Sequence, residues 1–178
     1  MSAQLSMEDI QHFSTNEGED LWSLSFQQPV LLVFLRHFNC QFCRELMYEL
    51  GKKREALEQA GSKLVLVHMS DQATSDKYFK RYKLTGVTNI SDPDLALYQF
   101  FGLGKGNAQQ LFGLNVWMRG FKVATTKNIW PGLYPQGDGF QMPGVFLLQE
   151  GQIKSSFIHR TAADKPEYFE MVKDCCKI

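Results

Sequence analysis

The sequence predicts an α/β fold in which a central mixed β-sheet is flanked by helices. Val30–Leu35 is an unbroken apolar run, which is typical of a central strand buried on both faces. A helical stretch then leads to a second apolar strand over Lys63–Ser70, and a connection of this length fits a parallel βαβ unit. Late in the chain, Val145–Leu148 and Gln152–His159 flank the turn Glu150-Gly151, which predicts an antiparallel hairpin.

Length and composition indicate one ordinary globular domain. The chain has 178 residues, of which 44% are hydrophobic and 21% are charged. Lys and Arg (19) balance Asp and Glu (19), which argues against nucleic acid or an anionic membrane as the main partner. The first residues lack a basic region followed by an apolar core, and no apolar run reaches the length of a membrane span. We therefore expect no membrane partner and a cytoplasmic location.

The elements before the central strand, and the helix after it, follow from local signals. Ser6 and Asp9 resemble a capping box, so a short helix is expected over Met7–Phe13. Leu21–Phe26 is interpreted as a brief strand or edge segment. The helix that follows the central strand is expected to run to Ala60 and to stop at Gly61.

The middle of the chain alternates helices with one short strand. Asp71 is expected to cap a helix over Gln72–Tyr82, and Val87–Ile90 is expected to form a strand. Asp92 is a good N-cap for a helix over Asp94–Phe101.

Residues 103–140 have the weakest pattern. A helix is predicted over Gln109–Lys127, and the final helix over Pro166–Lys173. The aromatic residues of the segment are expected to pack it onto its domain, with a pocket wall or a dimer surface as the alternatives. These residues are Phe112, Trp117, Phe121, Trp130, Tyr134 and Phe140.

A pair of cysteines follows the central strand at the spacing Cys-x-x-Cys. The apolar period changes after Cys43, so Cys40 is expected at the first turn of a helix. The partial positive charge of a helix N-terminus can lower a thiol pKa from about 8.5 to near 7. Arg36, His37 and Arg44 are expected to act in the same direction. Cys40 is the candidate nucleophile, and Cys43, one turn further on, is the candidate resolving thiol.

Other interpretations of the cysteines remain open. His37-x-x-Cys40-x-x-Cys43 could supply three zinc ligands, and two buried cysteines could be inert. The remaining cysteines, Cys175 and Cys176, are adjacent and cannot form a second Cys-x-x-Cys pair; they are either a C-terminal resolving pair or a surface pair without function. The strand and helix context favours redox chemistry that needs no metal or organic cofactor.

Three motifs carry a family resemblance. They are Phe34–Glu45, Ser91–Pro93 with Leu97–Leu103, and Gly137–Gly139 leading into Gly144–Phe146. With them the chain resembles the thioredoxin superfamily, and within it the peroxiredoxin-like branch of the alkyl hydroperoxide reductase/thiol-specific antioxidant proteins that includes selenoprotein L. The resemblance spans about residues 28–159. It implies one thioredoxin-like domain over residues 1–178, with an aromatic-rich insertion at about 103–140.

The resemblance also implies roles for site residues. Cys40 matches the attacking cysteine, and Pro143 matches the thioredoxin-type cis-proline, whose neighbour Met142 would face the Cys40–Cys43 disulfide; the alternative for Pro143 is an ordinary trans turn. His37 stands where catalytic peroxiredoxins carry Thr or Ser; an imidazole could orient a peroxide, shuttle a proton, or simply pack. The family's substrate-binding arginine from a later strand would be Arg160 or Arg119.

These observations lead to a thiol-dependent oxidoreductase as the main functional hypothesis. Its substrate would be a hydroperoxide or a disulfide, and a thioredoxin- or glutaredoxin-like protein would reduce it again. The alternatives are a thioredoxin-like disulfide reductase and a non-catalytic redox-sensing binding module. A homodimer is compatible with the sequence.

Overall fold

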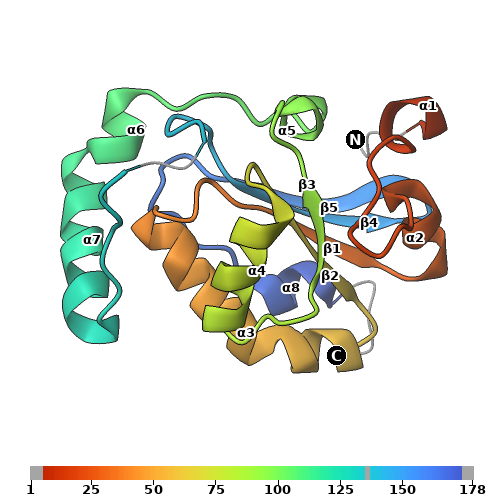
Figure 1. Ribbon diagram of the computed structural model, residues 1–178, viewed down its shortest axis with the longest axis horizontal. Coiled ribbons are helices and arrows are strands. Elements are labelled where there is room, and N and C mark those ends of the chain that lie inside the picture. Colours follow the sequence, from red (N-terminus) through yellow and green to blue (C-terminus); the bar gives the residue numbers. More distant parts are fainter. Residues whose placement is uncertain (1–5, 135–136, 174–178) are drawn as a thin grey trace.

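The protein is described here from a computed structural model that covers residues 6–134 and 137–173. The described chain forms a five-stranded sheet with helices on both faces (Figure 1). The elements in order are α1 (Met7–Ile10), α2 (Leu21–Gln27), β1 (Val30–Phe34), α3 (Gln41–Gln59), β2 (Lys63–His68), α4 (Gln72–Arg81), β3 (Thr88–Ser91), α5 (Ala96–Phe100), α6 (Ala108–Phe112), α7 (Leu114–Lys127), β4 (Gly144–Gln149), β5 (Gln152–Ile158) and α8 (Tyr168–Val172).

The sheet is mixed, and β1 lies at its centre. The strand order is β3-β2-β1-β4-β5, with β3, β2 and β1 parallel and with β4 antiparallel to both β1 and β5. Leu32, in the middle of β1, pairs with Val65 on one side and Phe146 on the other. The predicted α/β class with a central mixed sheet is confirmed.

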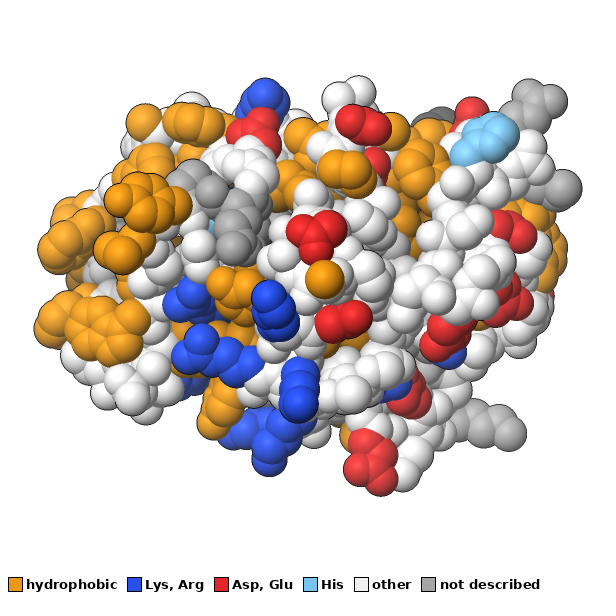
Figure 2. Space-filling model, viewed as in Figure 1, with side chains coloured by type: hydrophobic (Ala, Val, Ile, Leu, Met, Phe, Trp, Pro, Cys, Tyr) orange, Lys and Arg blue, Asp and Glu red, His pale blue; other side chains and the backbone are white. Residues whose placement is uncertain are grey.

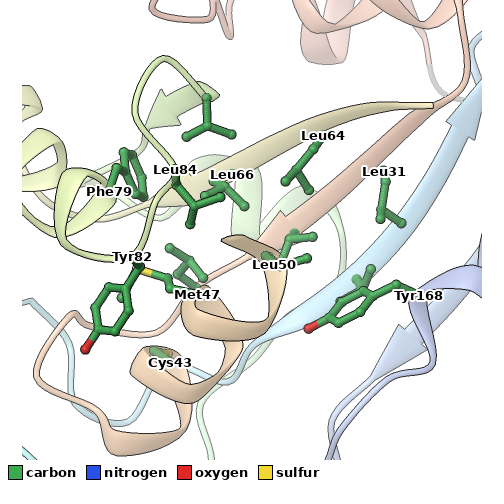
Figure 3. Close-up of a cluster of buried hydrophobic side chains, with 14 of the residues drawn as sticks. Leu31, Cys43, Met47, Leu50, Leu64, Leu66, Phe79, Tyr82, Leu84 and Tyr168 are labelled. Atoms are coloured by element: carbon green, nitrogen blue, oxygen red, sulfur yellow. The ribbon is translucent and has the colours of Figure 1, made fainter. Parts of the chain in front are cut away.

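Alternate residues of β1 enter two separate hydrophobic cores. Leu31 and Val33 point to the core beneath α3, whereas Leu32 and Phe34 point to the core on the opposite face, which α2 and α5 cover. Figure 3 shows the first core, with α3 lying across the sheet and Cys43 near the N-terminal end of this helix. Burial on both faces explains why the strand is apolar at every position.

Leu21–Phe26, interpreted from the sequence as a strand, forms helix α2, so that prediction was wrong. The Asp20 side chain caps the helix by accepting a hydrogen bond from the Ser23 backbone N–H at 2.9 Å. Leu21 and Leu24 are both buried, and their spacing of three residues places them on one helical face.

The helix predicted over Gln109–Lys127 is divided into α6 and α7 at Gly113. A Cβ atom at Gly113 would lie 2.4 Å from the Gln109 carbonyl oxygen, which is closer than a real side chain can approach. The other helices and strands match the predicted ones with ends shifted by a few residues.

The two ends of the segment 103–140 lie side by side. The Gly106 N–H donates to the Phe140 carbonyl at 2.7 Å, and the Met142 N–H donates to the Gly104 carbonyl at 3.0 Å. The segment follows α5 and leads into β4, and α6 and α7 lie at the left side of the view (Figure 1). We propose that it is an insertion in a single domain. Among the described residues, no helix combines the length and apolarity that a membrane span requires.

Candidate active site

The two cysteines lie where β1 gives way to α3. Cys40 is the N-cap residue of α3, as predicted, and its backbone N–H donates to the His37 carbonyl at 2.9 Å. Cys43 follows within the first turn. Both side chains are buried and both thiols are free. Cys175 and Cys176 lie outside the described residues.

Arg36 connects both thiols to the loop before β4. Its Nη1 donates to the Cys40 sulfur at 3.1 Å, and its backbone N–H donates to the Cys43 sulfur at 3.1 Å. Its Nε donates to the Gln141 carbonyl at 3.0 Å, and its Nη2 donates to the Gly139 carbonyl. The guanidinium is therefore held on three sides, with one N–H group aimed at Cys40.

The surroundings move the pKa values of the two thiols in opposite directions. A hydrogen bond from Cys43 and the charge of Arg36 lower the pKa of Cys40 to about 6, although burial acts against them. The backbone N–H groups of Phe42 and Cys43 contribute in the same direction. Burial raises the pKa of Cys43 well above its usual range, and the hydrogen bond to Cys40 adds to this. At neutral pH the thiolate is therefore on Cys40.

His37 is neutral at physiological pH. Burial and the nearby charges of Arg36 and Arg44 lower the pKa of His37 to about 4. The ring lines the pocket over Cys40, and its buried Nδ1 has no hydrogen-bond partner among the described residues. The expectation that a protonated His37 lowers the thiol pKa was therefore wrong.

The other arginines have structural contacts away from the Cys40 sulfur. Arg44 donates to the carbonyls of Phe38 and Trp130 at 2.9 and 2.8 Å. Arg119 pairs with Glu45 at 2.9 Å, and Arg160 is exposed. The pocket over Cys40 is lined by Arg36 and by neither Arg119 nor Arg160.

Pro143 lies on the inner side of the thiol pair. It lines a cavity of about 20 Å³ together with Cys43 and His159. The peptide bond between Met142 and Pro143 is trans, as is every peptide bond of the described residues, so the alternative of an ordinary trans turn holds and the cis form implied by the resemblance does not. Met142 packs with Leu111 in a small separate hydrophobic cluster.

An apolar pocket of about 550 Å³ opens above Cys40. Its walls come from the helices and the loop of the insertion, and the residues that line it include Phe112, Trp117, Phe121, Trp130, Leu133 and Phe140. All of these are more than half exposed, so the expectation that the aromatic residues pack the insertion onto the domain was wrong. These residues instead line the wall of a pocket, which was one of the two alternatives.

Polar residues around the cysteines hold this pocket in place. Gln41 Nε2 donates to the carbonyls of Gly120 and Ile129 at 2.9 and 2.6 Å. The Asn39 carbonyl accepts from the Gly132 N–H at 2.9 Å. The sequence reasoning did not single out Asn39 or Gln41; the only available signal was their position within His37–Cys43, beside the thiols.

The described residues contain no group of three or more His, Cys, Asp or Glu side chains placed to hold a metal ion. The His37, Cys40 and Cys43 set therefore does not form such a group here, and elemental analysis of the purified protein tests for zinc directly.

A free dithiol at the N-terminus of a helix, on a sheet of this topology, defines a thioredoxin-fold thiol protein. Residues 49–163 match the AhpC/TSA antioxidant enzyme family, and the chain belongs to this family. It is a peroxiredoxin-like member of the thioredoxin superfamily, as the motifs predicted.

Relatives agree with this assignment, and a solved structure agrees with the fold. The chain is 24% identical to the chloroplastic thioredoxin-like protein AAED1 of Arabidopsis thaliana, over 88% of this chain and 64% of the relative. It is 26% identical to prostamide/prostaglandin F synthase of Danio rerio, over 95% of this chain and 85% of the relative. It is 27% identical to human peroxiredoxin-like 2C, over 75% of this chain and 62% of the relative. The fold resembles a peroxiredoxin Q variant of Xylella fastidiosa, with a TM-score of 0.65 at 15% identity over 98% of this chain and 92% of the other. The chain thus spans less than two thirds of the length of the Arabidopsis and human relatives, 64% and 62% respectively.

Proposed function

We propose that the protein is a thiol peroxidase that reduces apolar hydroperoxides through Cys40 and Cys43. The observation that carries the proposal is the Cys40 sulfur, which accepts a hydrogen bond from Arg36 at 3.1 Å at the base of an apolar pocket. The lowered pKa of Cys40 supplies the thiolate, and Arg36 can stabilise the negative charge that develops on the peroxide oxygens.

The proposed reaction has three steps. The Cys40 thiolate bonds to the terminal peroxide oxygen, which keeps its hydrogen, while the O–O bond breaks. Cys40 becomes a sulfenic acid, and the leaving alkoxide takes a proton from water to become the alcohol. The Cys43 sulfur then bonds to the Cys40 sulfur, and the sulfenic oxygen leaves as water with the Cys43 proton. Finally, a thioredoxin- or glutaredoxin-like dithiol exchanges with this disulfide, restoring both thiols while it becomes oxidised itself.

The volume and the apolar lining of the pocket favour a bulky, apolar substrate. A hydrogen peroxide molecule needs little of a volume of about 550 Å³, whereas an organic hydroperoxide can fill it and bury apolar surface. The relative from Danio rerio is named for prostamide and prostaglandin, which are oxygenated lipids. A cytoplasmic location is part of the proposal, whereas the Arabidopsis relative is named as chloroplastic.

The test is stopped-flow oxidation of the reduced protein, followed by tryptophan fluorescence, with cumene hydroperoxide and hydrogen peroxide compared. We expect the organic hydroperoxide to react faster, Cys40→Ser to abolish both reactions, and Cys43→Ser to accumulate a sulfenic acid. Phe121→Ser, in the pocket wall, should slow cumene hydroperoxide selectively, whereas Phe26→Ser, an exposed aromatic residue outside the pocket, should change neither rate. Reaction with both peroxides at the rate of a free thiol would refute the proposal.

One observation favours a second candidate, a disulfide reductase. His37 replaces the hydroxyl residue that peroxidases of the family place three residues before the attacking cysteine, and its neutral ring has an unpartnered nitrogen at the pocket. Rapid reduction of a small disulfide through Cys40, with no acceleration of either peroxide reaction, would establish this function instead.

A further inference from the structure

Nine large apolar side chains of the insertion are exposed around the pocket mouth. We call them the apolar face: Phe112, Leu114, Trp117, Met118, Phe121, Trp130, Leu133, Tyr134 and Phe140, exposed between 51% (Phe140) and 92% (Leu133). Figure 2 shows hydrophobic side chains gathered over α6 and α7, with Lys and Arg side chains next to them. Exposed apolar groups of this size mark an interaction surface.

Helix α7 contributes two apolar faces, and only one of them is buried. Its inward face is formed by Val116, Val123 and Ala124, which are buried. Its outward side chains follow the spacing i, i+3, i+4, i+7 of a second stripe, and they are Leu114, Trp117, Met118 and Phe121. The outward stripe is therefore mostly exposed: Trp117 and Phe121 border the pocket over Cys40, whereas Leu114 and Met118 do not line it.

Basic side chains border the apolar face, and one of them, Lys122, has no ion pair among the described residues. Residues 95–137 contain four basic residues and no Asp or Glu, a local excess that the zero net charge of the chain conceals. Lys122, one turn after Met118 on α7, is exposed and makes no ion pair within the described residues. The other three basic residues are paired with acids: Lys105 with Asp138, Arg119 with Glu45, and Lys127 with Glu45 and Glu49. In each of these pairs the cation is the more exposed partner.

We propose that the apolar face binds an anionic lipid surface, with α7 lying in the plane of the interface. Aromatic and large aliphatic side chains bordered by lysines are typical of helices that lie at the boundary between headgroups and acyl chains. Anionic headgroups supply the negative charge that the face itself lacks. A second copy of the chain would instead place a second Lys122, also without an ion pair among the described residues, on the opposing surface, and it would bring no acidic side chain of residues 95–137 to offset it.

The pocket opens among the same side chains, since Trp117, Phe121 and Trp130 belong both to its wall and to the apolar face. An apolar molecule dissolved in the lipid could therefore reach Cys40 without crossing water. Lipid binding itself requires neither thiol, so it can be tested apart from the proposed reaction.

The experiment is flotation of the full-length reduced protein with vesicles of phosphatidylcholine alone and of phosphatidylcholine with phosphatidylglycerol. We expect binding to the anionic vesicles that weakens with salt. In Trp22→Phe, which retains Trp117 and Trp130, brominated lipid should quench the fluorescence. The double variant Leu114→Ser/Met118→Ser should lose at least about ten-fold in vesicle affinity, because two large apolar side chains no longer enter the lipid. Neither residue lines the Cys40 pocket, so its reaction with hydrogen peroxide should not change.

Two further variants define the outcomes. Lys122→Glu should weaken binding to anionic vesicles only. Ile158→Ser removes an exposed apolar side chain of β5, which is not part of the apolar face, and should leave binding unchanged. Absence of binding to anionic vesicles would overturn the proposal, as would equal losses in Ile158→Ser and the double variant. A third outcome would also overturn the proposal: the protein is a dimer in sedimentation equilibrium, the double variant is a monomer, and neither binds vesicles. The apolar face would then be an interface between two copies of the chain.

Discussion

Replacing Arg36 with methionine should raise the pKa of Cys40 by about one to two units. The Arg36 Nη1 lies 3.1 Å from the Cys40 sulfur, and a hydrogen bond to a charged group contributes about 1.5–3 kcal/mol, which corresponds to roughly one to two pKa units. The pKa of Cys40 in the native chain is about 6. The thiolate fraction at pH 6 should therefore fall from about one half to roughly 1–10%.

The assay is the pH dependence of alkylation of Cys40 by iodoacetamide, followed by mass spectrometry. It is run in the Cys43→Ser background, because a serine hydroxyl can still donate to the Cys40 sulfur. At pH 6 we expect Arg36→Met to react about 5–50 times more slowly than its parent, and near pH 9 we expect the two rates to converge.

Arg44→Met is the matched control for this experiment. It removes one positive charge from the next turn of α3, but Arg44 contacts the Phe38 and Trp130 carbonyls rather than the Cys40 sulfur. Its alkylation midpoint should stay near that of the parent. An unchanged midpoint in Arg36→Met would refute the reasoning, and an equal shift in Arg44→Met would mean that a diffuse positive field, and not the hydrogen bond, controls the thiolate.

Three other predictions concern the site and its support. His37→Thr should speed reaction with peroxide and not reduction of a small disulfide, measured in parallel by stopped flow; the opposite selectivity would favour the disulfide reductase. The pKa of Cys40 is about 6 in the folded protein, against about 8.5 for a free thiol. Ionisation of Cys40 therefore stabilises the reduced folded protein at higher pH, and this stabilisation is lost as the pH falls toward 6. Urea unfolding of the reduced protein should therefore lose about 2 kcal/mol between pH 8 and pH 6 relative to Cys40→Ser, and equal slopes would contradict the lowered pKa. Gly51→Ala should cost about 2 kcal/mol of unfolding free energy, because its Cβ would lie 2.0 Å from the Tyr82 carbonyl oxygen, whereas Gly104→Ala, with no atom within 4 Å, should cost little in thermal or urea unfolding.

The parts of the fold that the sequence predicts are those with local causes. A strand buried on both faces must be apolar at each position, so Val30–Leu35 identifies the sheet centre without knowledge of its partners. The change of period at Cys43 likewise places the start of α3, and therefore both thiols, from neighbouring residues alone. Asp92 does accept hydrogen bonds from the first N–H groups of α5, at Ala96 and Leu97, but the helix starts two residues later than predicted and its N-cap residue is Leu95, so the N-cap prediction for Asp92 was wrong.

The electrostatics of the site depend on contacts between distant parts of the chain. Arg36 faces Cys40 because the carbonyls of Gly139 and Gln141, more than a hundred residues later, hold its guanidinium. The ordinary pKa of a histidine is 6.5, and burial beside two arginines lowers the pKa of His37 to about 4, so its ring stays neutral even in mildly acidic solution. Spacing in the sequence identifies these side chains as candidates, but it does not reveal which of them carries charge or which one contacts sulfur.

Helix α7 shows why the apolar face was missed. A pattern of apolar residues at helical spacing predicts that a face is buried, but it does not reveal what buries it. Val116 and Val123 are buried by the protein itself, whereas Trp117 and Phe121 have the same helical apolar spacing and are exposed to solvent. A soluble helix gains nothing in its own fold from a second apolar stripe, and large exposed apolar groups promote aggregation. The outward stripe is therefore best explained by a contact outside the chain, and the basic, acid-free sequence on either side of it favours a negatively charged surface as that contact.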